Sequence, residues 1–136
     1  MIKHKIINIE TKGNCDILDI TSIVEKEVES SKVKDGICSV FVKGSTAAIS
    51  TIEFEEGLLQ DFKNFMDKIL PKANYEHNKA WGDENGHSHL RATLLKSSIQ
   101  IPIINSKLFL GTWQQIVLID FDTRPRKREI VISIYS

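Results

Sequence analysis

The sequence lacks a net charge, a secretion signal and any long apolar run, and each absence excludes a class of protein. Its 136 residues include 18 basic and 18 acidic side chains, so no global field attracts nucleic acid or an anionic membrane. No stretch approaches the roughly 18 consecutive apolar residues of a membrane span, and the N-terminal segment is not a signal peptide. We therefore expect a cytoplasmic protein with neither a nucleic-acid nor a membrane partner.

Cysteine is also scarce. The only two, Cys15 and Cys38, lie far apart in the sequence and form neither a Cys-x-x-Cys pair nor a disulfide framework. Both stand among apolar residues, which favours two buried thiols over a catalytic role.

The chain also has no internal repeat, no low-complexity linker and no shift in composition. Apolar residues make up 41% of the sequence and charged residues 26%, which is ordinary for a globular domain that buries its own core. We expect one domain spanning residues 1–136.

Hydrophobic periodicity predicts an α+β fold with a mixed, largely antiparallel β-sheet packed with helices. Ser22 and Glu25 form a capping-box pattern before a first helix that carries Val24 and Val28. The expected strands cover residues 6–9, 16–20, 37–42, 47–52, 100–104, 113–121 and 129–135.

Two further helices are expected in the second half of the chain. The first covers residues 56–70, with an apolar face formed by Leu58, Phe62, Phe65, Met66 and Ile69, and ends at Pro71. The second covers residues 89–96 and should point Leu90 and Leu94 inward.

Between these helices, residues 72–88 have no clear periodicity but are rich in polar side chains, and a loop this long is often functional. Imidazoles suit zinc-like ions and also proton transfer near neutral pH, so His77, His87 and His89 are candidates for both roles. His87 and His89 point the same way in an extended segment but diverge by about 200° in a helix. The competing interpretation is that His77 and His87 are surface residues and that Asn85 merely caps the next helix.

Three other segments contain residues that could bind a ligand. Residues 43–47, Lys-Gly-Ser-Thr-Ala, let a backbone approach a phosphate and supply hydroxyl donors, or form an ordinary hairpin turn; they are not a P-loop. Trp113 and Gln114 could line a pocket for a flat heterocycle, or the tryptophan could be a core residue. The basic turn 124–128 is either a solvated loop or a partner for phosphate or pyrophosphate.

Taken in order, these segments resemble the YjbQ-like family, the secondary thiamine-phosphate synthase proteins. That family shows a strand ending in His-Thr-Thr-Ala-Ala, then Tyr-x-His, Asn-x-x-x-His, Leu-Leu-Gly, Ile-Pro-Ile, Leu-Gly-Thr-Trp-Gln and Phe-Asp. The matching residues here are Gly44 to Ala48, Tyr75 and His77, Asn85 and His89, Leu94 and Leu95, Ile101 to Ile103, Leu110 to Gln114, and Phe121 with Asp122.

The resemblance implies an α+β protomer that assembles as a homotrimer, with a pocket for a small phosphorylated ligand near the protomer interface. It also implies a weak, secondary thiamine-phosphate synthase activity, which joins a pyrimidine pyrophosphate to a thiazole phosphate and expels pyrophosphate. On this hypothesis His89, Asn85 and His77 are the catalytic residues, and a divalent metal, zinc or magnesium, is held by His77, His87 and His89. The substrate-binding residues are then Ser45, Thr46, Thr112, Trp113 and Gln114.

The chain departs from the family pattern at two positions. Gly44 replaces the family's histidine, and Lys96 replaces the glycine that often ends the central helix. The first departure keeps two alternatives open: a non-catalytic oligomeric ligand-binding protein, and a metal-dependent phosphate-ester hydrolase. Glu53 or Asp61 could add a carboxylate to such a site, although Asp61 lies on the polar face of its helix.

Overall fold

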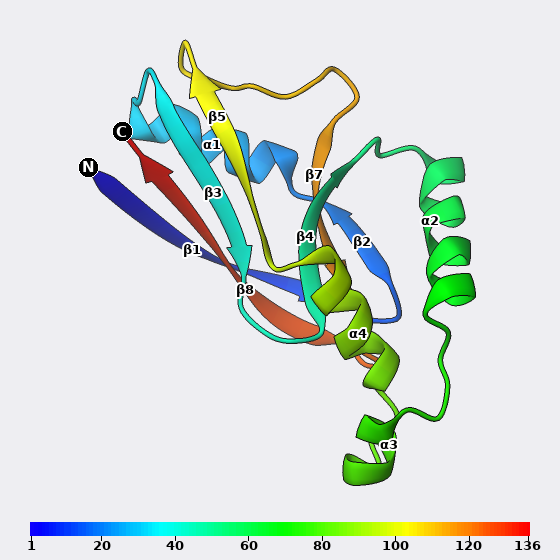
Figure 1. The fold of residues 1–136 in the computed structure, drawn as a ribbon. Coiled ribbons are helices and arrows are strands. Elements are labelled where there is room, and N and C mark those ends of the chain that lie inside the picture. Colours follow the sequence, from blue (N-terminus) through cyan, green and yellow to red (C-terminus); the bar gives the residue numbers. More distant parts are fainter.

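Two antiparallel β-sheets and four helices make up the protein in this computed structural model, which describes all residues from Met1 to Ser136 (Figure 1). The larger sheet has the order β1 (Ile2–Thr11), β8 (Arg126–Tyr135), β3 (Gly36–Val42), β5 (Ser98–Ile104) and β6 (Lys107–Leu108). The smaller sheet has the order β2 (Asp16–Asp19), β7 (Gln115–Asp120) and β4 (Ala47–Ile52). Every strand pair is antiparallel, so the predicted α+β fold is confirmed.

The main core forms because alternate residues of the strands turn the same way. Ile130, Ile132 and Ile134 of β8 are all buried, as their period-two spacing predicts, and belong to one hydrophobic cluster with residues of both sheets. Helix α1 (Thr21–Ser31) adds Val24 and Val28 to this cluster.

The capping-box prediction at Ser22 was wrong. Helix α1 begins one residue earlier, and the Asp19 carboxylate accepts hydrogen bonds from both the backbone N–H and the hydroxyl of Thr21, at 3.0 and 2.6 Å. Asp19 ends β2, so the side chain that holds the start of the helix lies outside the window where a capping box is sought.

Helix α2 (Glu56–Ile69) forms where its periodicity predicts, but its apolar face is only partly buried. The Glu55 carboxylate accepts hydrogen bonds from the N–H groups of Gly57 and Leu58 at its start. Met66 is buried and Phe62 packs against Phe121, whereas Phe65 and Ile69 remain exposed. Figure 1 shows α2 covering only one side of the small sheet, which explains why part of the face has no partner.

The segment expected to be a long loop contains helix α3 (Glu76–Trp81), and helix α4 (Gly86–Leu95) begins three residues before the expected start. Gly82, at φ +70°, ends α3 in the left-handed conformation that glycine adopts without strain. Gly86 is required where the helices meet, because a Cβ there would lie 2.6 Å from the Asn78 side chain.

Leu90 and Leu94 do not point inward as predicted, since both are exposed. Helix α4 instead packs Ala92 against the small sheet, where Ala48 of β4 belongs to the same buried cluster. Small side chains on both elements allow this close packing, and the leucine of α4 that packs against this cluster is Leu95.

Cys15 and Cys38 are buried free thiols, as expected, and burial raises their pKa values to about 11 and about 12. No helix combines the length and the apolar character that crossing a membrane would require.

Candidate functional site

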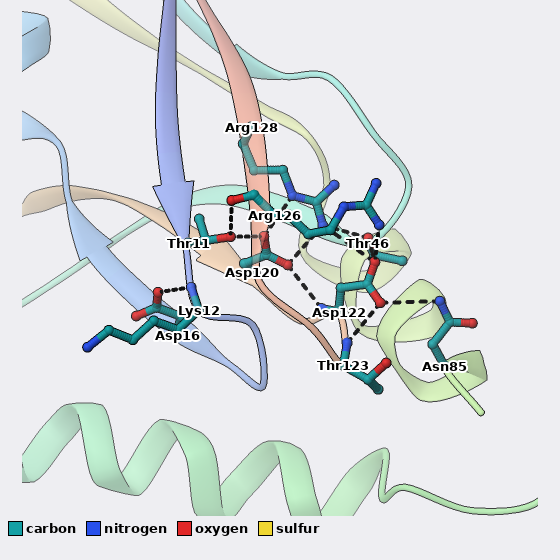
Figure 2. A network of polar contacts seen from close by, with 10 residues as sticks. All are labelled: Thr11, Lys12, Asp16, Thr46, Asn85, Asp120, Asp122, Thr123, Arg126 and Arg128. Carbon is teal, nitrogen blue, oxygen red and sulfur yellow. Dashed lines mark hydrogen bonds and ion pairs between the residues drawn. The ribbon is translucent and has the colours of Figure 1, made fainter. Parts of the chain in front are cut away.

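A buried network of charged side chains lies where β7 and β8 meet the end of β1 (Figure 2). Asp120, the last residue of β7, is 0% exposed, and Arg128 of β8 is 4% exposed. The guanidinium donates to the carboxylate from Nε at 2.7 Å and from Nη2 at 2.8 Å, and Thr11 donates its hydroxyl at 2.5 Å. This bidentate pair is the strongest geometry available to arginine and a carboxylate.

Asp122 is the second buried carboxylate of the network. It accepts hydrogen bonds from the Thr46 hydroxyl at 3.0 Å, from the Thr123 N–H at 2.8 Å and from Arg126 at 2.5 Å. Nη2 of Arg128 also lies 2.6 Å from the Thr46 hydroxyl oxygen, so this threonine connects the two carboxylates. Thr46 is therefore buried inside the network, and its hydroxyl is not free for a substrate.

Both carboxylates are held in the ionised state. Burial by itself would raise the pKa of Asp120, but hydrogen bonds from Arg128 and Thr11 outweigh it and place the pKa below the usual value. Burial likewise opposes ionisation of Asp122, and hydrogen bonds from the Thr123 N–H and from Asn85 help lower its pKa.

Asp120 and Asp122 are not among the predicted site residues, and Arg126 and Arg128 are considered only as part of the basic turn, although the sequence contains a signal for all four. One residue separates Asp120 from Asp122, and one separates Arg126 from Arg128. In an extended chain the two aspartates therefore point to one face, and so do the two arginines. The basic turn is thus more than a solvated loop, because two of its arginines are bound to buried carboxylates.

Asn85, at the start of α4, connects this network to the histidines. In one orientation of its amide, the nitrogen lies 3.3 Å from Asp122 Oδ1, and in the other it lies 3.0 Å from Asp83 Oδ1. Asp83 in turn is 3.5 Å from Nδ1 of His77. Asn85 therefore lies between a buried carboxylate and an exposed one.

His77 of α3 and His89 of α4 come together as predicted, with ring centroids 4.4 Å apart. Burial, followed by the neighbouring His77, lowers the pKa of His89 below its usual value. The imidazole of His89 is therefore neutral near pH 7 and keeps one N–H donor and one acceptor nitrogen.

His87 lies in a different environment. Its side chain is 5% exposed, and burial together with Arg91 and Lys72 lowers its pKa. Because α4 is helical at both positions, His87 and His89 diverge by about 200°. His87 Nδ1 and the neighbouring Ser88 hydroxyl have no hydrogen-bond partner in the protein.

The three histidines therefore do not gather at one point. No group of three or more histidine, cysteine, aspartate or glutamate side chains is arranged to hold a metal ion. His77 and His89 are the only two of the proposed ligands that lie together, so the divalent metal stays a prediction.

Beside His89 lies a pocket of about 300 Å³. Hydroxyls and one ammonium dominate its polar wall, and Ser45 is exposed and lines it; its role in binding a substrate stays a prediction. A larger hollow of about 570 Å³ lies beside α1 and β6, but no histidine and no buried carboxylate lines it. The residues lining the pocket beside His89 are Gly44, Ser45, Ala47, His89, Ala92, Thr93, Lys96 and Ser97.

Thr112, Trp113 and Gln114 are not part of this pocket. They precede β7, whereas Asp120 ends it, and six residues of strand span about 20 Å. Trp113 is 71% exposed, and Gln114 donates to the Thr51 hydroxyl at 3.2 Å. In Figure 1 the loop before β7 and helix α4 lie at opposite ends of the small sheet, so these residues could reach His89 only from another copy of the chain.

Glu53 and Asp61 are both exposed, and neither lines the pocket beside His89. The carboxylates nearest the histidines are instead Asp83 and Asp122.

The chain is similar to known proteins over nearly its whole length. Residues 5–136 match the model of the family described as UPF0047 protein YjbQ-like. A UPF0047 protein of Archaeoglobus fulgidus is 39% identical over 93% of this chain and 97% of its own length. One of Methanothermobacter thermautotrophicus is 41% identical over 93% of this chain and 87% of its own.

Solved structures agree with this assignment. A YjbQ-like protein of unknown function from Sulfolobus solfataricus superposes with a TM-score of 0.88 at 34% identity, covering 98% of both chains. A hypothetical protein from Aeropyrum pernix superposes with a TM-score of 0.91 at 29% identity, again over 98% of both chains. The match over almost the whole chain, together with the shared fold, shows that this protein belongs to the YjbQ-like UPF0047 family.

Proposed function

We propose that the protein binds a small phosphorylated molecule beside His89 and has a weak thiamine-phosphate synthase activity. In this reaction a nitrogen of the thiazole phosphate attacks the methylene carbon of the pyrimidine pyrophosphate. The new C–N bond forms as the C–O bond breaks, and pyrophosphate leaves. The observation that carries the proposal is the pocket in which Ser45, His89 and Lys96 share one wall.

Lys96 and Ser45 supply what a phosphoryl group requires, namely a positive charge and a hydroxyl donor. The neutral imidazole of His89 can donate one hydrogen bond to the ligand while adding no charge of its own. A transfer that expels pyrophosphate depends mainly on orientation and on stabilising the leaving charge, so no nucleophilic side chain is required.

The buried network has a positioning role in this proposal. It ties β8 to the end of β7, and in one orientation of the Asn85 amide it also ties them to the start of α4, the helix that carries His89. Held in this way, His89 lines the same pocket as Ser45.

A divalent metal bound in the site would neutralise charge on the departing pyrophosphate. Only His77 and His89 are placed together for that purpose, so no step above depends on the metal. Metal analysis of the purified protein tests this expectation. Stoichiometric metal that is lost in His89→Ala would establish the site, and its absence from both proteins would refute it.

The activity is tested by incubating the protein with the two substrates and Mg²⁺, then oxidising the product to a fluorescent thiochrome. We expect His89→Ala and Lys96→Gln each to lower the rate at least about tenfold. Lys107→Gln is the matched control for the lysine, because Lys107 lies on β6, outside the pocket. Absence of product from the wild type, together with no binding of the thiazole phosphate, would refute the proposal.

A non-catalytic ligand-binding protein is the second candidate, and Gly44 favours it. A side chain at this position would contact Arg128, so the structure around residue 44 is built for glycine. Binding of the thiazole phosphate without turnover would identify this case. No observation favours a metal-dependent hydrolase specifically, since no three-ligand group is present.

The proposed assembly is a homotrimer with the pocket near a protomer interface. Exposed Phe109 and Trp113, 68% and 71% accessible at the far end of β7, support a contact with another copy. Light scattering after size-exclusion chromatography tests the trimer, and a monomeric mass would contradict it.

A further inference from the structure

Gly44 lines two hollows of the protein, the pocket beside His89 and a second one. The second has a volume of about 520 Å³ and lies on the other side of this glycine, beside β8. No apolar side chain lines it, and four of its side chains are cationic. Its lining residues are Asn8, Lys43, Gly44, Arg126, Lys127, Arg128 and Glu129.

Arg128 directs an unused donor into this second hollow. Its side chain is 4% exposed, and its Nε and Nη2 are occupied by Asp120 and Thr46. The remaining nitrogen, Nη1, makes no hydrogen bond within the protein, although the guanidinium carries N–H donors there. Arg128 lines the hollow, and Nη1 is not one of the buried side-chain atoms that lack a partner, so this nitrogen is open to the hollow and can donate to an external acceptor there.

The space in front of Nη1 exists because residue 44 is glycine. A Cβ at this position would lie 2.8 Å from Nη1, closer than real side chains approach. Gly44 also has φ +126°, a conformation that other residues adopt only with strain. Both the backbone conformation and the missing side chain therefore leave this donor open.

Of the four cationic side chains that line the hollow, three are paired with a carboxylate and one is not. Lys43 pairs with Glu129 at 3.4 Å, and Arg126 is bound to Asp122. Lys127 has no carboxylate partner and lines the hollow, but it leaves β8 on the face opposite to Arg128, so its charge acts on the hollow from a distance while Nη1 of Arg128 is open to direct contact. An arginine edge together with a lysine suits the several acceptor oxygens of a phosphoryl group.

We propose that the hollow beside Arg128 is a second phosphoryl subsite, joined to the pocket beside His89 across Gly44. The inference rests on the proposed function, and it defines the substrate class further. The ligands carry two phosphorylated ends, such as the pyrophosphate of one substrate and the phosphate of the other, with one end on each side of Gly44. Arg128 Nη1 binds the second group, and Lys127 neutralises part of its charge.

The test counts inorganic phosphate ions bound per chain, by calorimetry and ³¹P NMR at low salt without metal. We expect two ions for the wild type, one for Gly44→Ala and one for Lys96→Gln. Gly82→Ala is the matched control, because Gly82 also has positive φ but a Cβ there would meet nothing within 4 Å. It places alanine at a positive φ without filling the subsite, with less strain than at Gly44 because φ +70° lies in the left-handed region, and it should still bind two ions.

The outcomes distinguish the subsite from the proposed function. If the wild type binds only one ion, and that ion is lost in Lys96→Gln but kept in Gly44→Ala, the subsite is overturned and the proposed function stands. If the wild type binds only one ion, and that ion is lost in Gly44→Ala but kept in Lys96→Gln, the subsite is supported and phosphate binding in the pocket beside His89 is contradicted. Equal binding of acetate would overturn the assignment to phosphoryl groups.

A second variant keeps the test decisive if Gly44→Ala does not fold by circular dichroism. Lys127→Gln removes an exposed charge, and we expect it to weaken the second phosphate at least about threefold. Lys107→Gln is its control and should bind like the wild type. Unchanged affinity in Lys127→Gln would then overturn the subsite.

Discussion

Replacing Arg128 with methionine should destabilise the protein strongly, because it leaves a carboxylate buried without its cation. Asp120 is 0% exposed and receives two hydrogen bonds from Arg128, at 2.7 and 2.8 Å. Thr11 and the Asp122 N–H would still donate to it, but both are neutral. Methionine fills a similar volume, so the effect reports on charge more than on a cavity.

Breaking a buried ion pair by removing one partner typically costs about 3–5 kcal/mol. Because two neutral donors remain on Asp120, we expect a loss of about 3 kcal/mol at pH 7. Natural domains unfold with only about 5–15 kcal/mol, so this is a large part of the total. The double variant Asp120→Asn/Arg128→Met should be more stable than Arg128→Met, since no charge is then left unpaired.

The loss should also depend on pH. In the wild type the folded pKa of Asp120 is lowered, so its stabilising contribution is present above the unfolded pKa of about 3.9 and is lost as pH falls through the folded value. Without Arg128, burial is no longer offset and the folded pKa rises above the unfolded value. The carboxyl then protonates in the folded variant first, so the difference between the two proteins narrows as pH falls from 7 towards 5.

Urea unfolding at one fixed protein concentration measures these free energies, since an oligomer's stability depends on concentration. Far-UV circular dichroism is the better probe, because Trp81 and Trp113 are already exposed in the folded state. A loss below about 1 kcal/mol for Arg128→Met, or a double variant less stable than the single one, would refute the reasoning. A difference that stays constant from pH 7 to pH 5 would refute the pH argument alone.

Three further predictions concern other parts of the chain. Neither Cys15 nor Cys38 should react with a thiol reagent at pH 8 unless the protein is unfolded, because burial raises their pKa values to about 11 and about 12; labelling of the native protein would contradict this. Glu55→Ala should lower the free energy of unfolding by about 1 kcal/mol in urea melts, since two N–H groups at the start of α2 lose their acceptor, whereas Glu55→Asp should cost less. In an NMR titration, the pKa of His89 should lie below 6.5 and should rise in His77→Ala, because His77 contributes to lowering it; an unchanged value would show that burial alone is responsible.

Local patterns predicted most of the secondary structure correctly. The period-two isoleucines of β8 and the helical repeat of α2 each report on one element, because burial on one face selects the same spacing wherever that element packs. The errors occur where the burial of a side chain depends on whether another helix or strand packs against it. Phe65 and Ile69 satisfy the helical repeat but are exposed, since no element covers that part of α2.

The prediction of the site residues shows the same division between local patterns and tertiary structure. His77, Asn85 and His89 lie close together in sequence, and the resemblance selected them as a group. His87 was grouped with them only because the start of α4 was unknown, and a shift of three residues turned it to another face of the helix.

The sequence by itself determined the fold class, the family and the segment that carries the histidines, because each depends on residues close together in the chain or on motifs in order. Only the tertiary structure decided which distant side chains meet. Thr11, Asp120 and Arg128 come from three strands and Thr46 from the turn before β4, and strand pairing brings them into one buried network. The same pairing places Gly44 against Arg128, a contact between residues far apart in the chain that no local pattern encodes.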